Sequence, residues 1–103
     1  MKKFRIIWTP QAKQDLRTIQ SYIAHFAPGP ARAFVARIRD RVRKLSTFPH
    51  ATVPVEELAR FDIREVYVGS YRVMFRVEAD VVRILTVVHG ARHFDDKRMD
   101  ENI

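Results

Sequence analysis

Three short apolar segments joined by very short links restrict the fold of this chain more than any other feature. Between Ile63 and Val88 the sequence alternates valine, isoleucine and aromatic residues with polar residues, as strands with one buried face do. Gly69-Ser70 interrupts this pattern, and glycine suits the first central position of a type II′ hairpin turn. Ala79-Asp80 is the candidate for a second turn of the same length. Because two-residue links join antiparallel neighbours, the region is predicted to form three antiparallel strands.

The first half of the chain has the signatures of one strand and two helices. Lys2–Trp8 alternates like a strand, and Thr9-Pro10 offers a hydroxyl N-cap followed by proline at the first helical position. The helix that follows is predicted to end at Ala27-Pro28-Gly29-Pro30, which is a turn signal. A second apolar stripe runs from Phe34 to Leu45. The order β-α-α-β-β-β predicts an α+β fold, with an N-terminal strand and a helical hairpin packed on one face of an antiparallel sheet.

The length and composition fit a single domain. The chain has 103 residues, of which 47% are hydrophobic, enough for one core. We expect one domain over residues 1–103, with residues 93–103 as a short acidic C-terminal tail. The first apolar run stops at Thr9-Pro10, too short for a signal peptide, and no segment approaches a membrane span. A cytoplasmic protein is therefore expected, and the lack of cysteine is compatible with a reducing compartment.

The strand register decides which way the arginines of the sheet point. A two-residue turn at Gly69-Ser70 places Tyr67 opposite Arg72, and the same reasoning at the second turn places Arg76 opposite Arg83. The outer face would then carry Glu65, Tyr67, Arg72, Met74, Arg76, Arg83, Leu85, Val87 and His89. The helix-covered face would carry Val66, Val68, Tyr71, Val73, Phe75, Val77, Val82, Ile84, Thr86 and Val88. A one-residue bulge near Gly69 would instead bring Arg64 onto the face of Arg72, and the sequence leaves both registers open.

The net charge points to an anionic partner. The formal charge is +7, and the last eleven residues carry two basic and four acidic side chains, so residues 1–92 carry a net +9. Arginines crowd the outer side of the second predicted helix, with Arg37 and Arg41 one turn apart, where like charges repel by a few tenths of a kcal/mol. Such a positive field favours nucleic acid or an acidic protein as the partner. The alternative is that the basic residues only keep the domain soluble.

Several classes of site are not indicated. The three glycines form no phosphate-binding loop, and the four histidines lack the spacing of metal ligands. The serines have no context of a catalytic triad. We expect neither a metal nor a cofactor.

Four segments carry a resemblance to a known family. They are Trp8-Thr-Pro-Gln-Ala12, the helical hairpin, Gly69-Ser-Tyr-Arg-Val-Met-Phe75 and Val87-Val-His-Gly-Ala-Arg92. In their order and spacing the chain resembles the RelE/ParE superfamily, the toxin halves of bacterial type II toxin–antitoxin pairs. The resemblance implies one of two activities. RelE-like members cut messenger RNA on the ribosome without a metal, whereas ParE-like members inhibit DNA gyrase through protein contacts.

A RelE-like site would need basic residues together with a group that transfers protons. By resemblance, Arg72 and Arg92 match family arginines, and Arg64 lies near one of a pair of strand lysines, whose second position is Val66 here. Arginine stabilises charge but does not act as a base, so His93 or His89 would have to carry the proton. Residues 94–103 contain no counterpart of the C-terminal tyrosine of RelE-like sites. The chain is therefore closer to ParE-like members.

These observations lead to a primary hypothesis and two alternatives. The first is a ParE-like toxin that inhibits DNA gyrase and growth, and that a cognate antitoxin neutralises in a hetero-oligomer. The second is a ribosome-dependent endoribonuclease acting on mRNA, with Arg64, Arg72, Arg92 and His93 as its catalytic set. The third is a toxin-like domain that survives as a binding module. For the first, the predicted partner-binding residues are Arg72, Met74, Arg76, Arg83, Leu85, Arg37 and Arg41.

Overall fold

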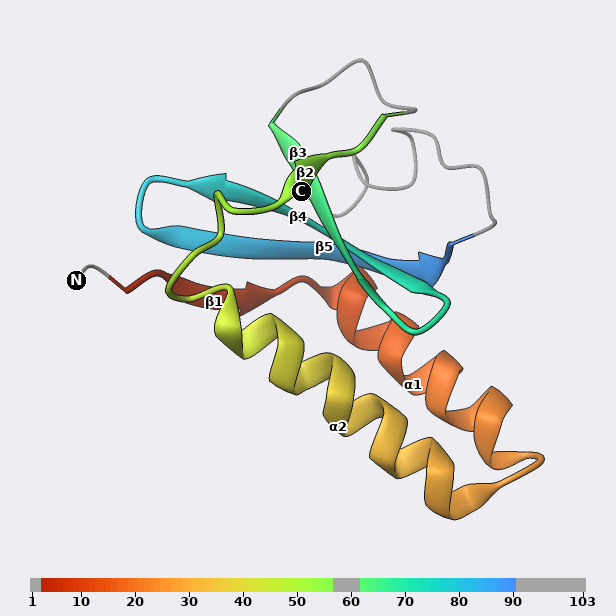
Figure 1. Cartoon of the computed structure of the whole chain (residues 1–103). Helices are drawn as coiled ribbons and strands as arrows, with labels where there is room; N and C mark the ends of the chain where they lie inside the picture. Colours follow the sequence, from red (N-terminus) through yellow and green to blue (C-terminus); the bar gives the residue numbers. More distant parts are fainter. Residues whose placement is uncertain (1–2, 57–61, 91–103) are drawn as a thin grey trace.

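The computed structural model describes residues 3–56 and 62–90, which form a sheet with a helical hairpin on one face (Figure 1). The helices are α1 (Pro10–Ala24) and α2 (Pro28–Lys44). The strands are β1 (Arg5–Trp8), β2 (Val53–Pro54), β3 (Ile63–Val68), β4 (Tyr71–Glu78) and β5 (Val81–His89), in the sheet order β1-β5-β4-β3-β2. The predicted α+β class and element order are confirmed, with the short β2 added between the helices and β3. The acidic tail, Arg92 and His93 lie outside the described residues.

Both helices begin where the sequence places prolines. The Thr9 hydroxyl oxygen accepts the Ala12 N–H at 3.1 Å and donates to the Leu85 carbonyl at 3.1 Å, so one cap residue ties the start of α1 to β5. Pro28-Gly29-Pro30, predicted as part of the connecting turn, instead forms the first turn of α2. Proline costs little there, because the first N–H groups of a helix have no partner within it.

Both predicted two-residue turns are confirmed. Tyr67 pairs with Arg72, and Arg76 lies opposite Arg83. Gly69 has a φ of 56° and Ala79 a φ of 50°, the positive values that a two-residue turn needs at its first central position. The alternative bulge near Gly69 is therefore wrong.

The edge strand β1 makes the sheet mixed. It pairs with β5 in parallel, from Arg5 opposite Val81 to Trp8 opposite Ile84. β3, β4 and β5 pair antiparallel as predicted, and the additional β2 pairs antiparallel with β3. A parallel pair needs a long crossover, and here the crossover is the helical hairpin with β2 to β4. β1 thus forms one edge of the sheet, next to β5, which is the last strand of the described chain.

A bulge in β5 corrects the predicted faces near its end. Met74 pairs with Thr86 but Phe75 pairs with Ile84, which leaves Leu85 without an opposite residue. Beyond the bulge the faces exchange, so Val87 belongs to the core under the helices and Val88 packs on the outer face. Both predictions for these valines were wrong, because two adjacent apolar residues fit either register.

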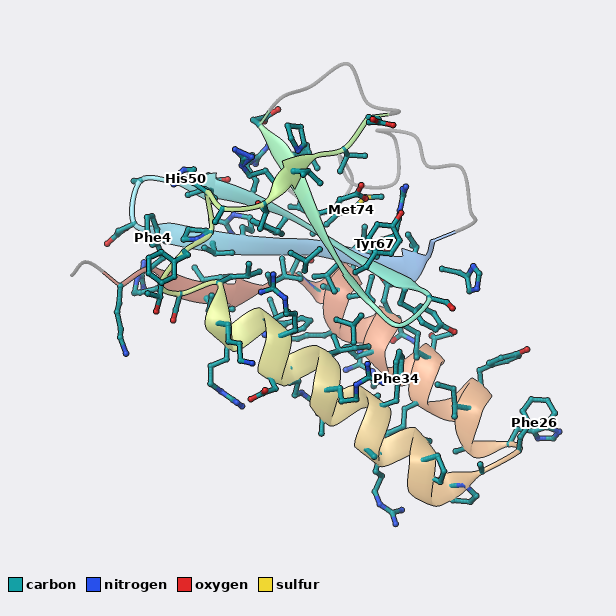
Figure 2. All side chains as sticks on the ribbon, viewed as in Figure 1. Phe4, Phe26, Phe34, His50, Tyr67 and Met74 are labelled. Carbon is teal, nitrogen blue, oxygen red and sulfur yellow. The ribbon has the colours of Figure 1, made fainter. Side chains whose placement is uncertain are left out.

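The sheet consequently has a core on each face. The main core lies between the helices and the sheet, and Phe75, Ile38 and Ile84 are fully buried in it. A smaller cluster on the opposite face, which we call the outer cluster, consists of Val55, Ile63, Met74, Leu85 and Val88. Met74 projects to the side of the sheet away from the helices (Figure 2). Burial of such a side chain contributes about 1.5–3 kcal/mol, so the outer cluster stabilises the fold as well as filling space.

Candidate partner-binding surfaces

Arg72, the first of the predicted partner-binding arginines, is a buried structural residue. Its side chain is 5% exposed, and its Nε lies 3.4 Å from Oε1 of Glu65, which is itself buried. Neighbouring positions on β3 and β4 bring the two side chains to the same face, Glu65 opposite Met74 and Arg72 opposite Tyr67. A charge pair taken out of water in this way stabilises only as a pair. Arg72 is therefore not a surface contact of the described structure.

Arg76 and Arg83 share one carboxylate. Glu78 Oε1 accepts from Arg76 Nε at 2.8 Å, and Glu78 Oε2 lies 3.3 Å from Arg83 Nε. Burial acts to raise the pKa of Glu78, but the hydrogen bond and charge of Arg76, with those of Arg83, outweigh it and hold the pKa below its usual value. The carboxylate thus resolves the like-charge pair across β4 and β5. The two side chains remain partly exposed, Arg83 more than Arg76.

Met74 and Leu85 are not exposed anchors, and that prediction is wrong. Both side chains have an exposed fraction of 0% and pack in the outer cluster. Leu85 lies on the outer face as predicted, but the other members of the outer cluster cover it there. On this part of the outer face the apolar side chains are buried against one another and are not open to a partner.

The residues of the alternative nuclease site do not converge within the described structure. Arg64 pairs with Phe75, on the helix-covered face, and its Nη1 donates to the Thr52 carbonyl at 3.0 Å. Arg72 lies on the opposite face. His89 is exposed and its ring meets that of Tyr71 edge-on at 5.5 Å. Arg92 and His93 lie outside the described residues. Arg64 and Arg72 cannot hold one phosphate between them.

Arg37 and Arg41, by contrast, meet at an open hollow. They line a cavity of about 260 Å³ between α2 and the β3–β4 turn, together with Lys44, Asp40 and Tyr67. The Arg37 guanidinium carbon lies 5.5 Å from the centre of the Phe34 ring, a cation–π contact, and Phe34 reaches toward the hairpin turn (Figure 2). Asp40 is the carboxylate of this lining, so positive charge dominates. The two helix arginines are the predicted contacts that the fold presents to solvent together.

A larger cavity, which the sequence did not indicate, lies beside α1. It has a volume of about 510 Å³ and lies between α1 and the end of β5, with Tyr22, Tyr71 and His89 among its lining residues. At its base Asp15 is 5% exposed and accepts hydrogen bonds from Gln11 Nε2 at 2.7 Å, from the Val87 N–H at 2.9 Å and from the Thr86 hydroxyl. In the sequence, the sign of this site was an acidic residue, Asp15, beside the apolar stripe of α1. Its hydrogen bonds to Thr86 and Val87 hold α1 against the bulged part of β5.

Two further kinds of site were sought in the described parts of the chain. Over residues 3–56 and 62–90, no three histidine, aspartate or glutamate side chains are grouped so that they could hold a metal ion. Neither α1 nor α2 is long and apolar enough to cross a membrane.

Comparisons with known proteins agree with this architecture. No curated protein matches the chain. Among solved structures, a chain of the chromosomal ParDE system from P. aeruginosa superposes with a TM-score of 0.74 at 20% identity, over 84% of this chain and 96% of that one. A chain of the RelBE2 toxin–antitoxin complex from Mycobacterium tuberculosis gives a TM-score of 0.64 at 22% identity, over 89% and 97%. These likenesses show the shared fold.

The family itself is shown by a match along the sequence. Residues 6–94 match the profile of the family described as the ParE toxin of the type II toxin–antitoxin system parDE, which covers both helices and β3 to β5. The predicted resemblance to the RelE/ParE superfamily is thereby confirmed. The chain belongs to the ParE toxin family of type II toxin–antitoxin systems.

Proposed function

We propose that this protein is a ParE-like toxin that stops growth by binding DNA gyrase in the cytoplasm, and that a cognate antitoxin neutralises it. The observation that carries the proposal is the separation of its charges. Arg64 and Arg72, the two described arginines of the nuclease set, are engaged by the Thr52 carbonyl and by Glu65, while Arg37 and Arg41 of α2 line an open hollow. Such an arrangement supports binding to an acidic protein surface better than proton-transfer chemistry.

The antitoxin is proposed as a second protein partner. Both solved neighbours come from toxin–antitoxin systems, which supports a hetero-oligomer for this chain. Of the predicted contact residues, Arg37 is exposed, and Arg41, Arg76 and Arg83 are partly exposed, so these four are the proposed contacts. Arg72, Met74 and Leu85 are reassigned to the interior. An acidic antitoxin segment would gain most at the hollow of Arg37 and Arg41.

The target is tested with two purified systems measured side by side. The full chain is added to a DNA gyrase supercoiling assay and, separately, to a cell-free translation system whose mRNA is examined for cleavage. We expect supercoiling to fall and mRNA to stay intact. Arg37→Glu/Arg41→Glu should relieve the inhibition, whereas Arg32→Glu, a change at an exposed α2 position outside the hollow, should not. Cleaved mRNA with undisturbed supercoiling would instead establish the RelE-like ribosome-dependent endonuclease.

A further inference from the structure

The side chains of α2 fall into rows along the helix, because residues three or four apart lie on the same side. One row is buried, and it consists of Ala31, Val35, Ile38 and Val42. Two residues before each of these lies an exposed residue of the opposite row, which we call the crest: Gly29, Ala33, Ala36 and Asp40. Two residues turn a helix by about 200°, so the crest points away from the core. In Figure 1, α2 runs along the lower border of the molecule, with the sheet above it.

The cations of α2 lie in the two rows between the buried row and the crest, which we call its flanks. One flank faces the hollow beside the β3–β4 turn and carries Arg37, Arg41 and Lys44. The other flank turns toward α1 and β1 and carries Arg32, Arg39 and Arg43. The helix therefore presents a narrow crest of mostly small side chains between two flanks of positive charge.

Most of this charge is not neutralised within the described structure. Asp40 is the one acidic residue of α2, and it contacts Arg43 at 2.9 Å and Lys44 at 3.8 Å. Both pairs are largely exposed and therefore weak. The described carboxylates form no ion pair with the other four cations, which are Arg32, Arg37, Arg39 and Arg41. These guanidinium groups can therefore meet an anionic partner without first losing one of their own.

The first helix extends the flank that faces it. Lys13 and Arg17 of α1 line a hollow of about 310 Å³ together with Arg39, and no carboxylate lies among its lining residues. Arg17 donates to the neutral Gln14 side chain at 3.0 Å, which leaves its charge uncompensated by that contact. The positive charge on this side is therefore broader than α2 alone.

The dimensions of this surface match the major groove of duplex DNA. An α-helix with its side chains is about 10–12 Å across, and the major groove is about 12 Å wide and admits one helix. With the crest toward the base edges, each flank faces one of the two phosphate backbones. The stretch from Arg32 to Lys44 is about 18 Å long, which corresponds to about five base pairs. Glycine and alanine on the crest allow the helix to approach closely.

The composition of the surface argues against two other partners. The centre of a protein–protein interface is rich in aromatic and other large apolar side chains. None of the exposed large apolar side chains of the described residues belongs to α2. Duplex RNA has a deep and narrow major groove, which does not receive a helix in this way. Interfaces with DNA, in contrast, are polar and strongly positive, as this surface is.

We propose that α2 binds duplex DNA in the major groove, with its crest toward the bases and one flank at each phosphate backbone. The binding is insensitive to base sequence, because contacts to phosphates carry no sequence information and glycine and alanine side chains form no hydrogen bonds to base edges. The inference goes beyond the proposed inhibition of gyrase and requires no gyrase. Because Arg37 and Arg41 belong to one flank, a protein partner seated in their hollow would exclude the DNA.

The test uses the full-length purified protein and a fluorescently labelled duplex of about 20 base pairs, with anisotropy measured between about 50 and 200 mM salt. Affinity should fall steeply with salt, because cations at phosphates release counterions. Arg32→Glu/Arg39→Glu and Arg37→Glu/Arg41→Glu each reverse two cations of one flank. Each should weaken binding about tenfold or more and reduce the salt dependence. Full loss in one variant and none in the other would overturn the two-flank geometry.

The matched control reverses two cations away from α2, in Lys3→Glu/Arg5→Glu. Phe4 and Ile6 pack against the main core, so the alternation of β1 directs Arg5 to the other face of the sheet. This variant should change affinity less than about twofold at physiological salt, which screens exposed charges more than about 8 Å apart. Urea unfolding of all three variants shows whether each is folded. Equal losses in three folded variants would mean that only net charge matters, and would overturn the proposal.

Competitors and a second duplex test the groove itself. Methyl green, which occupies the major groove, should displace the protein, whereas netropsin, which occupies the minor groove, should not. Duplex RNA of the same sequence should bind about tenfold more weakly or worse. Displacement by netropsin alone, or equal affinity for RNA, would overturn the proposal. A glutamate-rich peptide that binds more tightly than DNA and is lost in both flank variants would assign the surface to an acidic protein. None of these assays contains gyrase, so they are read separately from supercoiling.

Discussion

The arginines of the sheet and the arginines of α2 carry the same charge but have different surroundings. On the outer face of the sheet, Arg72 is enclosed with Glu65, and Arg76 and Arg83 share Glu78. On α2, Arg37, Arg39 and Arg41 line hollows that open between elements. The comparison teaches that residue type alone does not identify a binding residue. What separates the two groups is whether a carboxylate of the same chain reaches the guanidinium first.

The largest effect is expected when the carboxylate beside the buried arginine is removed, and it tests whether the two groups of arginines really differ. Glu65→Gln keeps the shape of the side chain but removes a buried charge beside Arg72, which should lower the free energy of unfolding by about 3–5 kcal/mol in urea denaturation. Asp40→Asn removes an exposed carboxylate and should cost less than about 1 kcal/mol. Similar losses for the two variants would mean that the sheet and helix arginines are equivalent.

The second prediction concerns the apolar part of the outer face. Met74→Ala should lower the free energy of unfolding by about 2–4 kcal/mol, because it opens a cavity in the outer cluster. Val53→Ala, at a side chain 61% exposed on the neighbouring β2, should cost far less. Thermal unfolding of both variants would decide the matter. If Met74→Ala were as mild as Val53→Ala, this face would be open to a partner after all.

The third prediction concerns the carboxylate between Arg76 and Arg83. The pKa of Glu78 is lower in the folded protein than in the unfolded chain, where it is near 4.5. The ionised Glu78 therefore stabilises the fold above that pH, and this stabilisation is lost as the pH falls through the lower pKa of the folded state. Because Glu78 is about one-third exposed, this contribution should stay below about 1 kcal/mol. Glu78→Gln should show a smaller fall in stability between neutral and acid pH than the parent protein. An unchanged pH dependence would contradict the ion-pair assignment.

The smallest stability effect is expected on α2. Arg37→Glu/Arg41→Glu replaces one like-charge pair by another and removes one cation–π contact, so the free energy of unfolding should change by less than about 1 kcal/mol. The same variant should lose affinity for a co-expressed antitoxin in pull-down or calorimetry. Changes around the sheet arginines would then lower stability, whereas changes to the α2 arginines would lower binding and leave stability nearly unchanged. A marked destabilisation by this variant would remove the distinction between them.

One of the two registers that the sequence left open for β3 and β4 is the observed one, and it depends on local chemistry. Gly69 allows the positive φ of a two-residue turn, and that turn alone aligns Tyr67 with Arg72 and excludes Arg64 from the same face. The bulge at Leu85 could not be predicted, because Leu85, Val87 and Val88 are all apolar and either register buries some of them. Leu85 failed as an anchor for another reason: it lies on the predicted outer face, but the outer cluster buries it.

Part of the candidate site was likewise predictable and part was not. The charge pattern of α2 indicated Arg37 and Arg41, and the helix presents them as expected. Nothing near Trp8 in the sequence indicated that its backbone would lie at a free edge with Arg39 beside it. That juxtaposition needs β1 to pair with β5, about 75 residues later in the chain.

By itself, the sequence determined the elements with local causes: the Thr9-Pro10 helix start, the two-residue turns, the apolar stripes and the excess of positive charge. Each depends on residues within a few positions of one another, where backbone sterics and capping act. The tertiary structure alone decided that Arg72 is enclosed with Glu65, that the outer cluster buries Leu85 and that β1 is an edge strand beside cations. These depend on which distant segments share the sheet, because burial and pairing are properties of the assembled chain.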